Sequence, residues 1–118
     1  MTIEDRLAGM GIVLPQAAAP AANYVPFVEV GGLLHISGQI SQGSDGTLIR
    51  GRLGEDMDVA AGQEAARRCA IALMAQMKAA LGDLGRVARI VKLNIFVNSA
   101  PGFTDQPEVG NGASDLMV

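Results

Sequence analysis

The sequence has few of the residues that cross-link small proteins through disulfides or metal ions, or that bind nucleic acid. It contains one cysteine, one histidine, one tyrosine and no tryptophan in 118 residues. The single cysteine, Cys69, cannot form an internal disulfide, and no Cys/His pair has zinc-ligand spacing, so we expect no structural metal site. Aromatic residues make up 3% of the chain and the net charge is -3. Because nucleic-acid binding uses basic surfaces and stacking rings, we expect no nucleic-acid partner.

Long apolar runs are also missing. No stretch approaches the roughly 18 consecutive apolar residues of a membrane-spanning helix, and the acidic start Met1–Asp5 lacks the basic region of a signal peptide. We therefore expect no membrane partner and a cytoplasmic location. The chain is 49% hydrophobic and 18% charged, which is typical of a folded protein. Its length suits one domain, predicted over residues 1–118, with an N-terminal helix and arm over 1–26 and an α+β body over 27–118.

The N-terminal third predicts a helix, an arm and a hairpin. Apolar residues at positions 3, 7, 10 and 13 favour a short helix over Ile3–Leu14. Three prolines in Pro15–Pro26 indicate an extended arm without regular structure. Phe27–Val30 and Leu33–Ile40 are rich in β-forming residues and flank Gly31-Gly32, which suits a two-residue turn.

A polar loop and one long helix follow. The loop covers Ser41–Gly54, with room for a short strand at Thr47–Ile49. Asp58 has the side chain and position of an N-cap for a helix over Val59–Leu81, and Gly82 is a typical residue at which a helix ends.

The last part of the chain predicts a strand and a second helix. Apolar and other residues alternate over Arg89–Asn98, as in a strand with one buried face. The second helix is expected to begin at about Pro107 and to include Asn111–Val118. The final residues, Leu116–Val118, are apolar, so we expect the chain to stop inside an unfinished element, with further strands needed to complete the sheet.

Four short segments, in a fixed order, carry a resemblance to a known family. They are Asn23-Tyr24-Val25-Pro26, the strand Gly32–Ile40 with its Ser37-Gly38-Gln39 ending, the strand Val91–Asn98, and Asn111-Gly112-Ala113-Ser114. From about Arg6 onward the chain resembles the RidA/YjgF family, also called the endoribonuclease L-PSP family. The preceding Leu14-Pro15 arm is similar to its YjgH-like branch.

The resemblance implies a chorismate-mutase-like α+β fold, in which two helices pack on one face of a mixed sheet and three subunits form a homotrimer. In the family, clefts between subunits hydrolyse reactive amino-acid-derived enamines and imines, such as 2-iminobutanoate and 2-iminopropanoate, to 2-oxo acids and ammonia. No cofactor takes part. Compared with this pattern, the chain is expected to lack the last strands.

The resemblance also implies site residues. The family's active-site tyrosine falls on Tyr24, and its helix asparagine falls on Asn111. The strand-end glycine that lines the pocket falls on Gly38, which with Ser37 is expected to bind the substrate. The family's carboxylate-binding arginine and its glutamate belong to the last two strands and would lie beyond Val118.

Structural alternatives stand beside these roles. Tyr24 could be an aromatic anchor that packs a loop, and Asn111, which follows a glycine, could be a helix cap. With the resemblance, the site role is favoured for Tyr24, and Asn111 could serve both purposes.

Other titratable residues have simple structural interpretations. His35 has no partner nearby in the sequence for a catalytic triad or a metal. Cys69 falls on the apolar stripe of the long helix, as a buried inert thiol would. Glu55, Asp56 and Asp58 could bind a cation, but they precede a helix start, where capping is the usual role of acidic residues.

Three functions follow from the sequence. The first is a cofactor-free imine deaminase, a hydrolase acting on small amino-acid-derived substrates. The second is a trimeric module that binds small carboxylic acids such as 2-oxo acids without turnover, since no arginine of this chain matches the family's substrate-binding arginine. The third, a ribonuclease, is disfavoured by the acidic net charge.

Overall fold

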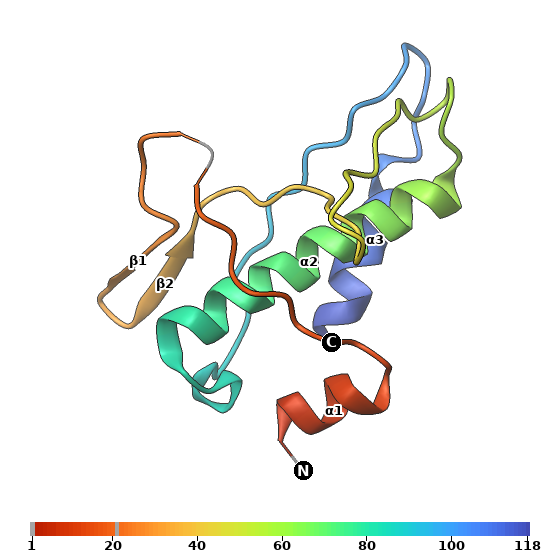
Figure 1. The fold of residues 1–118 in the computed structure, drawn as a ribbon. Helices are drawn as coiled ribbons and strands as arrows, with labels where there is room; N and C mark the ends of the chain where they lie inside the picture. The colour runs from red at the N-terminus through yellow and green to blue at the C-terminus, as the bar shows by residue number, and fades with distance from the viewer. Residues whose placement is uncertain (1, 21) are drawn as a thin grey trace. The chain divides into compact units, whose positions relative to one another are not determined.

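The computed structural model describes residues 2–20 and 22–118 (Figure 1). Within these residues, the elements in chain order are α1 (Ile3–Gly9), β1 (Phe27–Val30), β2 (Leu33–Ile36), α2 (Val59–Leu81), the 3-10 helix η1 (Leu84–Arg86) and α3 (Gln106–Met117). The chain divides into two compact units. The first unit comprises 1–39 and 71–89, the second comprises 40–70 and 90–118, and α2 contributes residues to both.

Helix α1 is shorter than expected. A capping box starts it: the Asp5 backbone N–H donates to the Thr2 hydroxyl at 3.1 Å, and the Thr2 N–H donates to the Asp5 carboxylate at 3.2 Å. The helix ends at Gly9 instead of continuing to Leu14, because the chain turns through Gly11, whose φ is 75°. Leu7 and Ile12 are buried, as the apolar spacing predicts for position 7.

The hairpin confirms the prediction for this part of the chain. β1 and β2 pair antiparallel, with Phe27 opposite Ile36 and Val30 opposite Leu33. Gly31 and Gly32 both have positive φ, at 59° and 80°, which matches the type of two-residue turn that fits the twist of paired strands. The second strand ends at Ile36 rather than Ile40.

The polar loop contains an isolated bridge between Gln42 and Leu48 instead of the short strand expected at Thr47–Ile49. Asp45 organises the turn between these two residues, since its carboxylate accepts from the Thr47 hydroxyl at 2.7 Å and from the Thr47 N–H at 3.0 Å. These hydrogen bonds, above all the one from the hydroxyl, hold the pKa of Asp45 below its usual value. Local side-chain bonding therefore competes with strand pairing here.

The bounds and caps of α2 are as predicted. The Asp58 carboxylate accepts from the Ala61 N–H at 2.8 Å, which makes Asp58 the N-cap. At the other end, the Gly82 N–H donates to the Lys78 carbonyl at 2.7 Å, and Gly82 has a φ of 79°.

Replacing Asp58 with alanine should therefore lower the free energy of unfolding by about 1 kcal/mol, the usual value of an N-cap side chain. Asp105 offers a matched control, because it occupies the N-cap position of α3 but makes no side-chain capping bond. Urea denaturation should show a clearly smaller loss for Asp105→Ala. Equal losses for the two variants would contradict the capping role of Asp58.

In the second unit, α3 packs closely against α2. Buried residues Ala66, Ala70 and Ala113 form one apolar cluster, joined by the half-buried Leu116 and Met117. Small residues permit the approach: a Cβ added at Gly112 would collide with the backbone of Gln63, lying 2.8 Å from its Cα and closer still to its carbonyl oxygen. The helix expected from about Pro107 is thus confirmed, with Gln106 as its first residue.

The strand expected over Arg89–Asn98 is not formed. In the part of the chain that the structure describes, the sheet has two antiparallel strands rather than the mixed arrangement expected. Residues 87–98 are irregular and partly exposed, with Val91 at 72% and Phe96 at 95% exposure. A strand needs a hydrogen-bonded neighbour. The segment gains one at its end, where the Leu53 N–H donates to the Asn98 carbonyl at 2.9 Å and a parallel bridge joins Ser99 to Leu53.

Candidate functional site

Tyr24 lies on the proline-rich arm of the first unit, directly before β1. Its side chain is 47% exposed. The arm accepts hydrogen bonds from other parts of the chain on both sides of Tyr24. The Gln76 side-chain amide of α2 donates to the Ala18 carbonyl at 2.9 Å, and Ser37 binds the Pro26 carbonyl. The arm is therefore held at both ends while the ring between them stays accessible.

Ser37 and Gly38 follow directly after β2. The Ser37 N–H and hydroxyl both donate to the Pro26 carbonyl, at 2.9 and 3.1 Å. A Cβ added at Gly38 would meet nothing within 4 Å, so the backbone of this exposed glycine is open to a small molecule. The structure thus brings the end of β2 to within two residues of Tyr24 along the arm. The hydroxyl of Ser37 holds these two segments together.

Asn111 belongs to the second unit. It is exposed and lies inside α3, five residues after the first residue of the helix, and its side-chain oxygen accepts from the Ser114 hydroxyl at 3.5 Å. The N-cap position of α3 is Asp105. The interpretation of Asn111 as a helix cap is therefore wrong, and its side chain remains available for another role.

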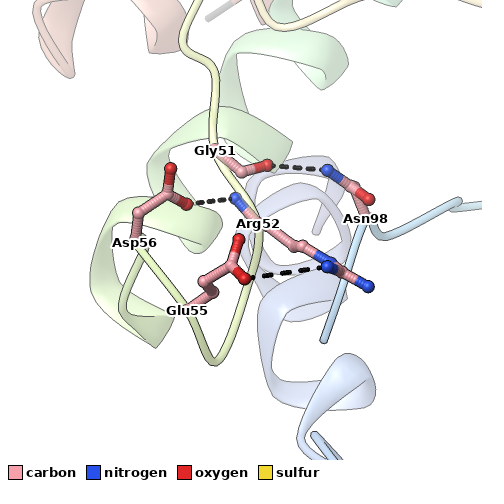
Figure 2. Close-up of polar contacts among 5 residues, drawn as sticks. All are labelled: Gly51, Arg52, Glu55, Asp56 and Asn98. Carbon is pink, nitrogen blue, oxygen red and sulfur yellow. Dashed lines mark hydrogen bonds and ion pairs between the residues drawn. The ribbon is translucent and has the colours of Figure 1, made fainter. Parts of the chain in front are cut away.

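A polar cluster in the second unit joins the loop before α2 to the segment ending at Asn98 (Figure 2). The Asn98 amide donates to the Gly51 carbonyl at 3.0 Å, and the Arg52 N–H donates to the Asp56 carboxylate at 2.6 Å. The Arg52 guanidinium lies 3.7 Å from Glu55. Glu55 and Asp56 are thus used in this turn and do not cap α2, unlike Asp58.

His35 is the titratable candidate of the hairpin. His35 is exposed in β2, opposite Val28. No group of three His, Cys, Asp or Glu side chains suitable for a metal ion occurs among the described residues. In the same residues, no helix is long and apolar enough to cross a bilayer.

Cys69 is half-buried on α2, and burial raises the pKa of its thiol above the ordinary value of 9.0. Because the thiolate is the reactive form, we expect a disulfide reagent at neutral pH to label the native protein much more slowly than the urea-unfolded chain. Raising the pH should speed native labelling but leave it slower than labelling of the unfolded chain. Each molecule should yield one thiol. Equal native and unfolded rates would contradict the burial of Cys69.

Gln76, which holds the arm that carries Tyr24, is not among the residues that the sequence motifs indicate. Among the described residues it is the only fully buried polar side chain, at 1% exposure. A glutamine inside the apolar run Ala70–Met77 was the available signal, because buried polar groups require partners.

Comparison with known proteins places these residues in a family. Residues 4–118 match the family model described as "YjgF/chorismate mutase-like, putative endoribonuclease". The Trypanosoma cruzi protein TCP17 is 55% identical over 116 residues, which cover 98% of this chain and 72% of TCP17. The chain therefore belongs to the YjgF/chorismate mutase-like family, as its motifs predict.

Two solved structures support the fold. Atu1372 from Agrobacterium tumefaciens, described as of unknown function, is 49% identical with a TM-score of 0.87, over 98% of this chain and 71% of that chain. A protein from Shewanella oneidensis MR-1 described as a "putative endoribonuclease" is 36% identical with a TM-score of 0.90, over 99% and 78%. The α+β, chorismate-mutase-like fold class is thus confirmed.

Proposed function

We propose that the protein containing this chain is a cofactor-free deaminase that hydrolyses reactive enamines and imines derived from amino acids. The products are 2-oxo acids and ammonia. The observation that carries the proposal is the anchored arm: the family's tyrosine, Tyr24, is accessible two residues from the carbonyl that Ser37 binds, beside the open backbone of Gly38. Membership of the family supports it.

The proposed reaction needs few protein groups. For 2-aminoacrylate, tautomerisation gives 2-iminopropanoate, water adds to the imine carbon, and the carbon–nitrogen bond breaks to release ammonia and pyruvate. The protein must hold the substrate carboxylate, orient one water molecule and move protons. The hydroxyl of Tyr24 can donate or accept a hydrogen bond at the reacting nitrogen or water, and the backbone of Gly38 can line the pocket.

The remaining roles are assigned by family resemblance. We propose that Asn111 positions the water or substrate, that Ser37 helps to bind the substrate, and that an arginine and a glutamate of the family's last strands grip the carboxylate and activate the water. We further propose a homotrimer with sites at its subunit interfaces and a cytoplasmic location. The residues 1–118 are proposed to act as one domain of that assembly.

An assay that generates 2-aminoacrylate in situ tests this proposal. The protein should accelerate the release of ammonia and pyruvate in equal amounts, and heat-denatured protein should not. RNA should be neither cleaved nor bound in a salt-dependent way, because a net charge of -3 disfavours binding to the phosphate backbone. Cleavage of RNA without any deamination would favour the activity in the family's description instead.

A second candidate is a module that binds small carboxylic acids without turnover. The observation that favours it is the open backbone of the exposed Gly38 beside the anchored arm, which could bind a small molecule whether or not turnover follows. Calorimetry with a 2-oxo acid separates the two functions. Binding without acceleration of imine hydrolysis would support the binding module, whereas binding with hydrolysis would support the deaminase.

A further inference from the structure

Gln76 occupies an unusual place for a polar residue. Its side chain is 1% exposed on α2, and its neighbours Ala75 and Met77 are also buried. An amide buried without a hydrogen-bond partner costs about 1–3 kcal/mol, so a polar residue is retained at such a position only where a partner compensates for this loss. The partner here is the Ala18 carbonyl, 58 residues earlier in the chain and 2.9 Å from the donating nitrogen.

The described residues of the arm include few that could hold it by other means. Pro20 and Pro26 cannot donate backbone hydrogen bonds. Ala18, Tyr24 and Val25 are exposed, with Val25 at 61%, so their side chains bury little apolar surface. Hydrogen bonds therefore help to set the course of the arm, and those from Gln76 and from Ser37 lie on opposite sides of Tyr24.

We propose that Gln76 is a positioning residue, which acts through the arm to hold the Tyr24 side chain in its working place. This inference deepens the proposed deaminase function and rests on it for its consequence in catalysis. The positioning itself concerns residues of the first unit alone and can be measured without any activity.

The sequence provides a direct probe. Tyr24 is the only tyrosine and the chain has no tryptophan, so its intrinsic fluorescence reports on the arm. Gln76→Met keeps the length of the side chain and removes the donor. Loss of the anchor should lower the fluorescence anisotropy and raise quenching by acrylamide. Because the ring is already 47% exposed, the quenching constant should rise by at most about two-fold.

Gln63→Met is the matched control. The Gln63 amide also donates to a backbone carbonyl at 2.9 Å, that of Glu108, but both residues lie in the second unit. This variant should leave the tyrosine signal unchanged. If Gln76→Met does not fold, Gln76→Glu carries the test. Its carboxyl can donate to the Ala18 carbonyl only when protonated, so quenching should be high at neutral pH and fall towards the wild-type value as the pH is lowered.

Activity gives the second measurement. Gln76→Met should lower kcat/KM by about ten-fold, because a misplaced reacting group is poorly oriented towards the substrate. In a Tyr24→Phe background, the same substitution should cause no further loss of kcat/KM. Unchanged quenching and anisotropy in a folded Gln76→Met protein, or additive losses with Tyr24→Phe, would overturn the proposal. If the wild type shows no deamination but Gln76→Met frees the Tyr24 ring, the positioning role stands and only the deaminase function fails.

Discussion

Replacing Gly112 with alanine is expected to lower the free energy of unfolding by about 3 kcal/mol, at the upper end of the range for overpacked sites. The added methyl group would meet the Gln63 carbonyl and lie 2.8 Å from the Gln63 Cα. These are backbone atoms of α2, so no side-chain rotation can relieve the contact. Helix α3 would have to move away from α2, and the cluster around Ala70 and Ala113 would open.

Gly9→Ala is the matched control for this substitution. Gly9 is also helical, but a Cβ there would meet nothing within 4 Å. Since alanine is the better helix former, the control should be neutral or slightly stabilising. Urea denaturation of both variants measures the difference. A Gly112→Ala protein as stable as the wild type would show that α2 and α3 do not approach each other as described.

Replacing Tyr24 with phenylalanine is expected to lower kcat/KM for imine hydrolysis by about 100-fold, the lower end of the range for a general acid or base. The hydroxyl is the group proposed to act on the substrate or water, and the substitution removes little else. Because the ring is 47% exposed, stability should change by less than about 0.5 kcal/mol.

Thr104→Val is a control for the loss of an exposed hydroxyl from an irregular segment of the second unit. It should retain wild-type kcat/KM. A Tyr24→Phe protein that folds normally and keeps full activity would support the simpler interpretation of Tyr24 as an aromatic anchor. It would also remove the residue on which the proposed site is built.

The parts of the fold that the sequence predicts well depend on neighbours in the chain. The Asp58 cap, the Gly82 end of α2 and the Gly31-Gly32 turn are decided within a few residues, and each is found where expected. The segment Arg89–Asn98 has the alternation of a strand, but alternation supplies no partner. Strand formation depends on a neighbour from elsewhere in the chain or assembly, and a local pattern does not contain that information.

In the candidate site, too, some features follow from local sequence and others depend on contacts between distant segments. Tyr24, Ser37 and Gly38 can be identified because their spacing follows a family pattern, and their roles in catalysis remain predictions. The double hydrogen bond from Ser37 to Pro26 and the buried amide of Gln76 arise from contacts between distant segments. The alternative of a helix cap at Asn111 is excluded by the helix start itself, because the helix predicted from about Pro107 begins at Gln106 and places Asn111 in its interior.

The central claim is tested most directly by measuring how the rate of ammonia release from 2-aminoacrylate, generated in situ, depends on protein concentration. The experiment uses the protein as its gene encodes it. The proposed function predicts a rate that rises in proportion to the protein added, with one pyruvate formed per ammonia, and that falls about 100-fold in Tyr24→Phe. A rate no faster than the spontaneous reaction at every protein concentration would contradict it.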